Sequence, residues 1–193
     1  MAKQAREVER SPLARLTGAL YLAYFATTII TTIVESHIPK AIGTAGNLLA
    51  YVLYAITSLL FYNLFKPVDR RLSLVAALVS LAGCVVGSLG LFNLPAYHIN
   101  VLYFFGPYCL LLGILILGSK FLPRILGALM VLAGLGWLLF LIPAVAKHIG
   151  TGIEALGVLA EGLLMLWLVA MGVNVQKWQK QARAQEKAAN GSG

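Results

Sequence analysis

The chain has 193 residues, of which 60% are hydrophobic and only 11% are charged. Soluble globular domains carry about a quarter charged residues, so this composition excludes an ordinary soluble domain and indicates an integral membrane protein. The mean hydropathy of +0.84 agrees with that class. The two cysteines, Cys84 and Cys109, both lie inside apolar segments, which excludes a secreted disulfide framework.

Six apolar segments are each long enough to cross a bilayer as a helix, which takes roughly 20 residues. They cover residues 16–34, 46–65, 72–94, 99–118, 125–145 and 151–173. The sequence therefore predicts an all-α fold in which residues 16–173 form a bundle of six transmembrane helices. Residues 1–15 are predicted to form a cytoplasmic segment. Residues 174–193 are predicted to form a basic cytoplasmic tail that continues the sixth helix for a few turns. The first span lacks a small-residue cleavage site, so we expect it to be retained as an anchor.

The basic residues lie almost entirely on one side of the predicted membrane. Thirteen of the fifteen Lys and Arg residues fall in the two ends of the chain and in the loops after the second and fourth spans, which leaves Lys40 and Lys147 on the other side. The positive-inside rule therefore places both termini in the cytoplasm. The net charge of +8 is explained by this topology and by contact with anionic membrane lipids, and we expect no nucleic-acid partner.

Weak internal similarity suggests a repeated unit. The odd-numbered spans each begin just after an arginine, and the stretch RLTGAL at Arg15 resembles RILGAL at Arg124. Short loops between spans also favour antiparallel neighbours. Together these features suggest three helical hairpins in parallel orientation. Chance recurrence of small and apolar residues is the alternative explanation.

Glu161, near the middle of the sixth span, is the most deeply placed charged residue. An acid at that depth costs roughly 2.5 kcal/mol or more on insertion scales, so its side chain is expected to face protein. Glu154 lies seven residues earlier and projects from the same helix face. Two roles stay open for Glu161. It could be a functional group, such as a proton relay, a general acid or a counter-charge, or it could be a protonated acid that forms an interhelical hydrogen bond.

Polar and aromatic residues on other spans are candidates to face Glu161. The first span carries a polar stripe, which is unfavourable against lipid and is therefore expected to face the bundle interior: Tyr21, Tyr24, Thr28, Thr31 and Glu35. Pro107 is expected to kink the fourth span beside an aromatic region. The predicted ligand pocket consists of Glu161, Glu154, Tyr24, Thr28, Tyr54, Tyr103 and Tyr108.

The three histidines, His37, His98 and His148, all fall on the outer side of the predicted topology. Three histidines with a nearby carboxylate could bind zinc or haem. Their spacing matches no compact metal motif, so we expect no metal and no cofactor.

The third span has a face of small residues that would let another helix approach closely. This face consists of Ala76, Ser80, Gly83, Cys84, Gly87 and Ser88. It is a candidate contact for a homo-oligomer.

Several segments resemble one bacterial family of multi-pass membrane proteins. They are RLTGALYL from Arg15, LFKPVDR from Leu64, FLPRILG from Phe121, LAGLG from Leu132, and Glu161 ahead of LWL. The family is domain of unknown function forty-three eighty-six. The resemblance implies a six-helix domain in the bacterial inner (cytoplasmic) membrane and supplies no activity. The chain departs from the family's acidic second-span pattern at Tyr54 and Thr57.

Three functions are consistent with these features. The first is a non-enzymatic protein that binds or transports a small amphipathic or cationic molecule in an intramembrane pocket around Glu161. The second is an intramembrane enzyme that uses Glu161 as a general acid on a lipophilic substrate, such as a prenyl, terpenoid or lipid molecule. The third is a structural or assembly subunit of a membrane complex.

Overall fold

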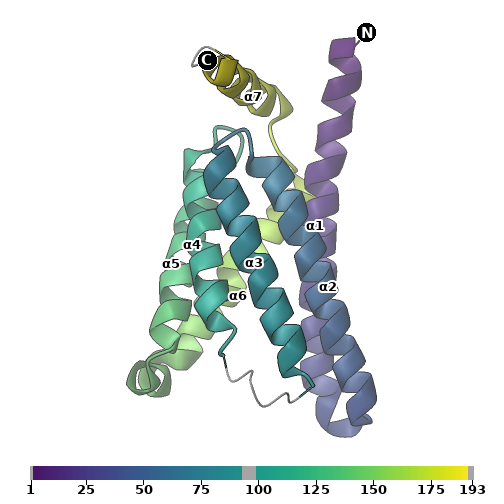
Figure 1. The fold of residues 1–193 in the computed structure, drawn as a ribbon, viewed down its shortest axis with the longest axis vertical. Helices are drawn as coiled ribbons and strands as arrows, with labels where there is room; N and C mark the ends of the chain where they lie inside the picture. The colour runs from purple at the N-terminus through teal and green to yellow at the C-terminus, as the bar shows by residue number, and fades with distance from the viewer. Residues whose placement is uncertain (1, 93–98, 191–193) are drawn as a thin grey trace.

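In a computed structural model that describes residues 2–92 and 99–190, every regular element of those residues is a helix (Figure 1). The helices are α1 (Ala2–Val34), the short 3₁₀ helix η1 (Glu35–His37), α2 (Lys40–Phe65), α3 (Arg70–Gly90), α4 (Leu102–Gly118), α5 (Arg124–Phe140), α6 (Pro143–Ala170) and α7 (Val175–Asn190). The predicted all-α fold is confirmed.

Four stretches in the described part of the chain are long and apolar enough to cross a membrane. They are Pro12–His37, Lys40–Phe65, Arg70–Gly90 and Pro143–Ala170. α4 and α5 are equally apolar in character but have only 17 residues each. At 1.5 Å per residue each is about 26 Å long, somewhat less than the roughly 30 Å hydrocarbon core. By length and composition the structure therefore has four candidate spans, where the sequence predicted six.

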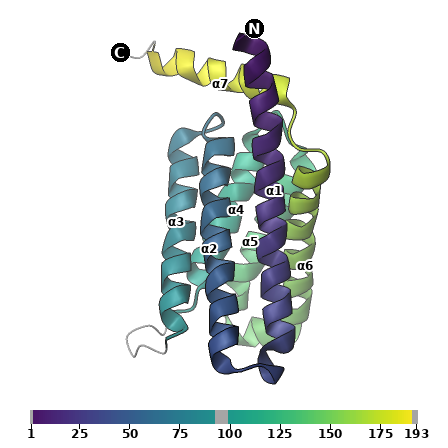
Figure 2. The same cartoon turned by 90° about the vertical axis from the view of Figure 1, so that its right-hand side faces the viewer.

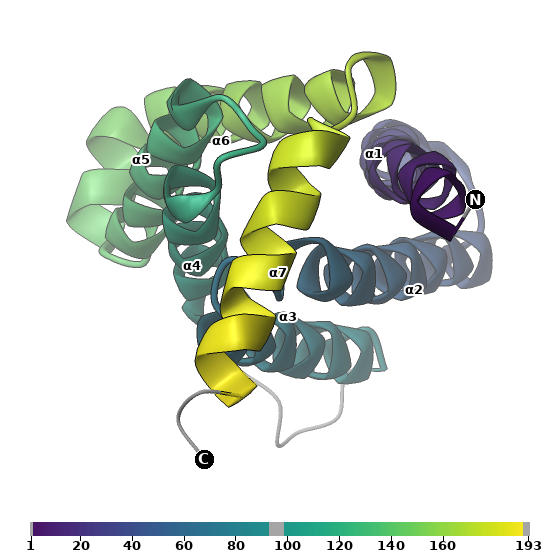
Figure 3. The ribbon, with the colours of Figure 1, turned by 90° about the horizontal axis from the view of Figure 1, so that it is seen from above.

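Helices α1 to α6 run side by side along the bundle (Figures 1 and 2), and seen from above they form a closed ring (Figure 3). Each of α1 to α6 packs against its neighbours in the chain, and α6 packs against α1. The closest pair is α4 and α5, which belong to two different hairpins of the predicted repeat. Large side chains fill the centre, among them the fully buried Tyr21, Leu112 and Leu164.

Four glycines let α4 and α5 approach each other. Gly106 and Gly113 on α4 face Gly134 and Gly127 on α5. A methyl group added at Gly113 would lie 2.7 Å from the backbone nitrogen of Val131 and 2.9 Å from the carbonyl oxygen of Gly127. The backbones are therefore in contact, as is common between membrane helices whose interfaces carry small residues.

The small-residue face of α3 is turned toward the same chain. The Ser80 hydroxyl shares a 2.6 Å hydrogen bond with Ser58 of α2. Gly87 lies against the ring of Tyr51, and Gly83 lies against Phe104 of α4. These residues pack inside the ring, and an oligomer contact through this face stays a prediction.

The prediction that the tail continues the sixth helix is wrong. α6 ends at Ala170, and Gly172 adopts the left-handed conformation with a φ of 63°, which glycine favours at a helix end. Asn174 then starts a new helix, because its side chain accepts a hydrogen bond from the backbone N–H of Lys177 at 3.0 Å. α6 also begins earlier than predicted, since Pro143 is favoured in the first turn of a helix.

The new helix, α7, lies across the end of the bundle at which α1 begins (Figure 3). Trp178 is buried there, and its indole N–H donates to the carbonyl oxygen of Leu64 at 2.8 Å. Gln181 donates to the carbonyl oxygen of Gly118 at 3.2 Å and accepts from the backbone N–H of Lys120 at 3.1 Å. The inner face of α7 thus satisfies backbone groups at the ends of α2 and α4.

Replacing Gly113 with alanine is expected to destabilise the fold, because the added methyl group would force α4 and α5 apart at a cost of about 1–3 kcal/mol. The matched control is Gly152→Ala, at a helical position with open space around it. There alanine should be neutral or stabilising by up to about 1 kcal/mol. Unfolding midpoints of both variants in detergent measure the difference, and equal midpoints would contradict the close crossing.

Candidate functional site

Glu161 is buried at the centre of the bundle and is hydrogen-bonded to α1. It is 3% exposed, and the Tyr21 hydroxyl donates to its Oε2 at 2.6 Å. Tyr21 is itself fully buried. The distance lies in the range of strong, charge-assisted O–H···O bonds. The pair joins α1 to α6, where the ring of helices closes. The sequence predicted that the side chain of Glu161 faces protein, and its burial agrees with that prediction.

Trp137 of α5 lies beside the same carboxyl group. Its indole packs on Gly157, one helical turn before Glu161, and interacts with the carboxyl group. The indole N–H is buried, and its geometry falls short of a hydrogen bond to any described group. Glu161 therefore has one well-formed donor and a second buried donor nearby, which reduces the cost of burying the acid.

Tyr21 is also the first member of a continuous aromatic array. Its ring lies 6.0 Å from that of Tyr24 and 6.3 Å from that of Tyr54, measured between ring centroids. Tyr54 extends the array to Tyr24 at 4.7 Å, and to Phe105 and Tyr108 at 5.7 Å each. The rings connect α1, α2 and α4 across the interior of the ring of helices.

A cavity of about 180 Å³ lies beside this array. Its walls come from α1, α2, α3, the start of α4 and the residue before it, and they consist of Tyr24, Tyr51, Tyr54, Ser80, Gly83, Cys84, Val101, Leu102, Phe104, Phe105 and Tyr108. Six of these eleven residues are aromatic, so rings can face a ligand from several directions. The cavity is smaller than the 300 Å³ or more of a typical drug-sized site, so it suits a small molecule or one end of a longer one.

The Tyr54 hydroxyl is buried and makes no hydrogen bond with any described group. A buried hydroxyl without a partner is unfavourable by roughly 1–3 kcal/mol, and such groups are rare in folded proteins. Because Tyr54 also lines the cavity, a molecule bound there could supply the missing partner.

The structure brings together some of the predicted pocket residues. Tyr24, Tyr54 and Tyr108 line the cavity, whereas Glu161 is absent from its lining and is connected to it through Tyr21. The other three candidates lie elsewhere: Thr28 bonds to the carbonyl oxygen of Tyr24 on its own helix, Tyr103 is 60% exposed, and Glu154 is exposed.

Sequence reasoning did not include Tyr21, Trp137 and Phe105 in the site. Tyr21 belongs to the polar stripe of the first span, so its spacing from Tyr24 was the signal that could have found it. Phe105 belongs to the aromatic region beside Pro107, which was the signal for it. Trp137 gave no such signal, because a single aromatic residue in an apolar span can face either lipid or protein.

The described residues contain no group of three or more His, Cys, Asp or Glu side chains that could hold a metal ion. His37 and His148 are exposed, and His98 lies outside the described residues. The cysteines are buried, Cys84 beside the cavity and Cys109 in the core.

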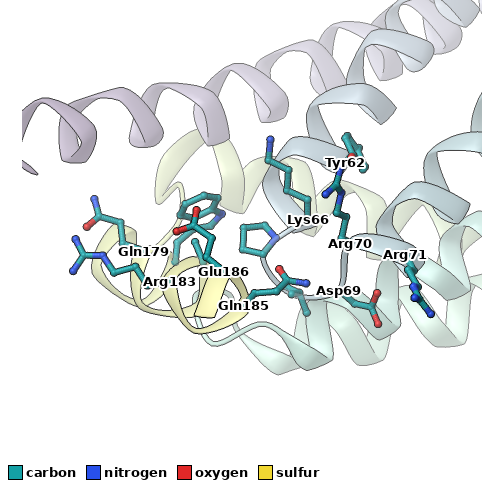
Figure 4. Close-up of a pocket in the computed structure, with 13 residues that line it drawn as sticks. Tyr62, Lys66, Asp69, Arg70, Arg71, Gln179, Arg183, Gln185 and Glu186 are labelled. Carbon is teal, nitrogen blue, oxygen red and sulfur yellow. The ribbon is translucent and has the colours of Figure 1, made fainter. Parts of the chain in front are cut away.

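Two larger cavities flank α7 at the end of the bundle. The first, of about 960 Å³, lies between α7 and the α2–α3 loop and carries charges of both signs (Figure 4). Its charged residues are Lys66, Asp69, Arg70, Arg71, Arg183 and Glu186. The second, of about 710 Å³, lies between α7 and the α4–α5 loop.

Comparison with known proteins places the chain in a family. The profile of the family described as Domain of unknown function (DUF4386) matches residues 40–99 and 95–172. The chain belongs to this family. The resemblance seen in the sequence is thereby confirmed, and the match covers α2 to α6, which include Tyr54, Tyr108 and Glu161.

A protein of Archaeoglobus fulgidus, described only as an uncharacterized protein, is 27% identical to the chain over 143 residues. The alignment covers 69% of this chain and 86% of the archaeal protein. No solved structure matches the chain. Neither description names an activity.

The bond between Tyr21 and Glu161 is expected to stabilise the bundle. Tyr21→Phe leaves the buried carboxyl group without its donor and should cost about 1–3 kcal/mol. Because Glu161→Leu removes the same bond, the double variant should lose less than the sum of the two single variants, with a coupling of about 0.5–3 kcal/mol. Unfolding in detergent measures the cycle.

Tyr103→Phe is the control for this cycle, since it removes a hydroxyl from an exposed tyrosine on α4 and should change stability by no more than about 0.5 kcal/mol. Strictly additive losses in the double variant would show that Tyr21 and Glu161 do not depend on each other.

Proposed function

We propose that this protein binds a small amphipathic or cationic molecule in the aromatic cavity between α1, α2, α3 and α4. The observation that carries the proposal is the unpartnered, buried hydroxyl of Tyr54 on the wall of a cavity. Lipophilic walls suit a ligand that enters from the bilayer. The single open hydroxyl suits a ligand with one hydrogen-bonding group.

The array of tyrosine rings favours a ligand with positive charge. Cations bind to the faces of aromatic rings, and such contacts are worth about 2 kcal/mol or more when water is excluded. Tyr24, Tyr54 and Tyr108 present rings from three helices to the cavity. A quaternary or alkylated ammonium group is of a size that a small aromatic cavity accommodates.

Glu161 contributes to this proposed site through Tyr21. The carboxyl group fixes the Tyr21 hydroxyl at 2.6 Å, and the Tyr21 ring packs on Tyr24 and Tyr54. The acid therefore positions two cavity rings, and it places a counter-charge one tyrosine away from a bound cation. A general acid has to contact its substrate directly or through one bridging water. Glu161 does not line the cavity, so it is poorly placed to donate a proton to a molecule bound there. The geometry thus supports a binding protein over the intramembrane enzyme.

A structural role has its own support in the Tyr21–Glu161 bond, because that bond joins the first and last helices of the ring. In this second proposal the acid serves only as an interhelical contact, and the protein acts as a subunit of a membrane complex. The two proposals differ in one consequence, which is whether a molecule occupies the cavity.

We also propose that α1 to α6 all cross the membrane, with both termini in the cytoplasm of a bacterium and the chain in its inner membrane. The predominance of basic residues at the α7 end supports this orientation, and the tight α4–α5 pair supports insertion of the two shorter helices together.

The orientation can be tested with single cysteines that replace Lys187 or Lys147 in a protein without Cys84 and Cys109. A membrane-impermeant maleimide added to intact cells should label only the cysteine at position 147. Labelling at position 187 would reverse the orientation.

Filling the cavity is expected to remove the bound molecule. Cys84→Phe places a ring inside the cavity, while Val85→Phe places the same ring on the neighbouring position, which is 58% exposed on the outer surface. Mass spectrometry of extracts from the purified proteins should find a small molecule with the wild type and with Val85→Phe, and should find it lost from Cys84→Phe.

Tyr54→Phe provides the second arm, because it removes only the unpartnered hydroxyl and should leave the empty protein as stable as before or more stable. Its extract should contain less of the molecule. Equal recovery of every small molecule from all four proteins would contradict a ligand in the cavity and would favour the structural role.

A further inference from the structure

The cavity between α7 and the α4–α5 loop is lined by four basic side chains. Lys120 and Arg124 come from the loop and the start of α5, and Lys177 and Lys180 come from α7. No Asp or Glu is among the residues described as lining it. The remaining walls are Ser119, Leu122, Gln181 and Ala184. The four side chains are exposed, so water screens their mutual repulsion in part, and an anion between them would reduce it further.

This cavity differs in charge from the one on the other side of α7. The cavity beside the α2–α3 loop has two acids among its six charged residues, and Asp69 also caps α3 by accepting from the backbone N–H of Leu72 at 2.9 Å (Figure 4). Basic residues there can be neutralised within the protein. Around the α4–α5 loop the residues described as lining the cavity supply no such acid, and the four basic side chains are exposed, so an anionic ligand can reach them.

The backbone adds donors to the same place. α5 begins at Arg124, and the residue before it, Pro123, provides no side-chain cap for the first turn. Free N–H groups at a helix start favour phosphate and other oxyanions. The base of the cavity is fixed, since Gln181 bonds to both Gly118 and Lys120, and Ser119 is held by a 2.8 Å bond to the carbonyl oxygen of Ile116.

Apolar surface lies directly beside these cations. Ile125, next to Arg124, is 64% exposed, and Leu117 and Ile114 on α4 are also exposed. In a membrane protein such residues contact acyl chains. A ligand at this position would therefore have its anionic group among the lysines and its hydrocarbon along α4 and α5, which is the form of a phospholipid.

We infer that the cavity formed by Lys120, Arg124, Lys177 and Lys180 binds the phosphate group of an anionic phospholipid, which fastens α7 to the α4–α5 loop. The phosphate bridges the two walls. The acyl chains extend along the outer surface of α4 and α5. This site is separate from the aromatic cavity, and the two can be tested independently.

The test uses the full-length protein in detergent with three probes, which are phosphatidylglycerol, phosphatidylcholine and inorganic phosphate. Native mass spectrometry measures lipid binding to the wild type and to two double variants. Lys177→Gln/Lys180→Gln removes two charges from the cavity. Lys40→Gln/Lys147→Gln removes two exposed charges from the opposite end of the bundle, and therefore controls for net charge.

Phosphatidylglycerol should bind the wild type more tightly than phosphatidylcholine. The loss of two lysines near a lipid headgroup, at about 1 kcal/mol each, should weaken its binding about thirtyfold. The opposite-end variant should bind it as the wild type does. An equal loss in both double variants would show a response to net charge alone and would overturn the site. Competition by inorganic phosphate at millimolar concentration would overturn its assignment to a lipid.

Lys177→Arg/Lys180→Arg controls for a folding defect caused by substitution at these positions. It keeps both charges and should therefore keep phosphatidylglycerol binding. If it loses the lipid while the unfolding midpoint stays that of the wild type, the charge explanation is contradicted. Limited proteolysis gives the second readout: phosphatidylglycerol should protect α7 in the wild type and not in Lys177→Gln/Lys180→Gln. Equal protection of both would also contradict the site.

Discussion

The hydrogen bond between Tyr21 and Glu161 is the interaction on which the interior of this bundle depends. A carboxyl group cannot be buried among apolar helices without a donor, and the donor comes from the helix that lies farthest from Glu161 in the chain. The bond therefore links the first and last helices of the ring. One turn away, Gly18 of α1 lies against Leu168 of α6, so the two backbones are close enough for the bond to form. The orientation of the Tyr21 ring, and with it the packing of Tyr24 and Tyr54, follows from this contact.

A second constraint is the close approach of helix backbones. Hydrophobic burial gives little net attraction between helices that are surrounded by lipid, so contact between backbones at small residues contributes much of the packing energy. The glycines between α4 and α5 serve this purpose, and they allow two helices of only 17 residues to form the tightest pair in the ring. By contrast, the aromatic side chains between α1, α2, α3 and α4 leave a cavity, which lies beside the close contact of Gly83 with Phe104.

The end of the bundle that carries α7 combines structural contacts with charge. Trp178 and Gln181 satisfy backbone carbonyl groups of α2 and α4, while the exposed side of α7 is basic. In the proposed topology, an amphipathic helix in this position would lie at the level of the lipid headgroups. The proposed phospholipid site thus uses the same helix that covers the ends of the bundle, and Gln181 takes part in both roles, because it bonds to the backbone and also lines the cavity.

The sequence by itself determined the membrane class, the helical fold, the family and the burial of Glu161 against protein. Those properties follow from composition, from the length of apolar segments and from a charge placed where water is absent. The positions of helix ends were less well determined. Pro143 and Gly172 act through local backbone geometry, and α6 therefore begins and ends earlier than the sequence predicted.

Only the tertiary structure decided which residue meets Glu161. Tyr21, Tyr24 and Thr28 share one polar stripe, and helical spacing alone cannot choose among them. The choice depends on the rotation of α1 against α6, which the close contact at Gly18 fixes. The same holds for α7, whose direction across the bundle depends on carbonyl groups brought together from distant parts of the chain.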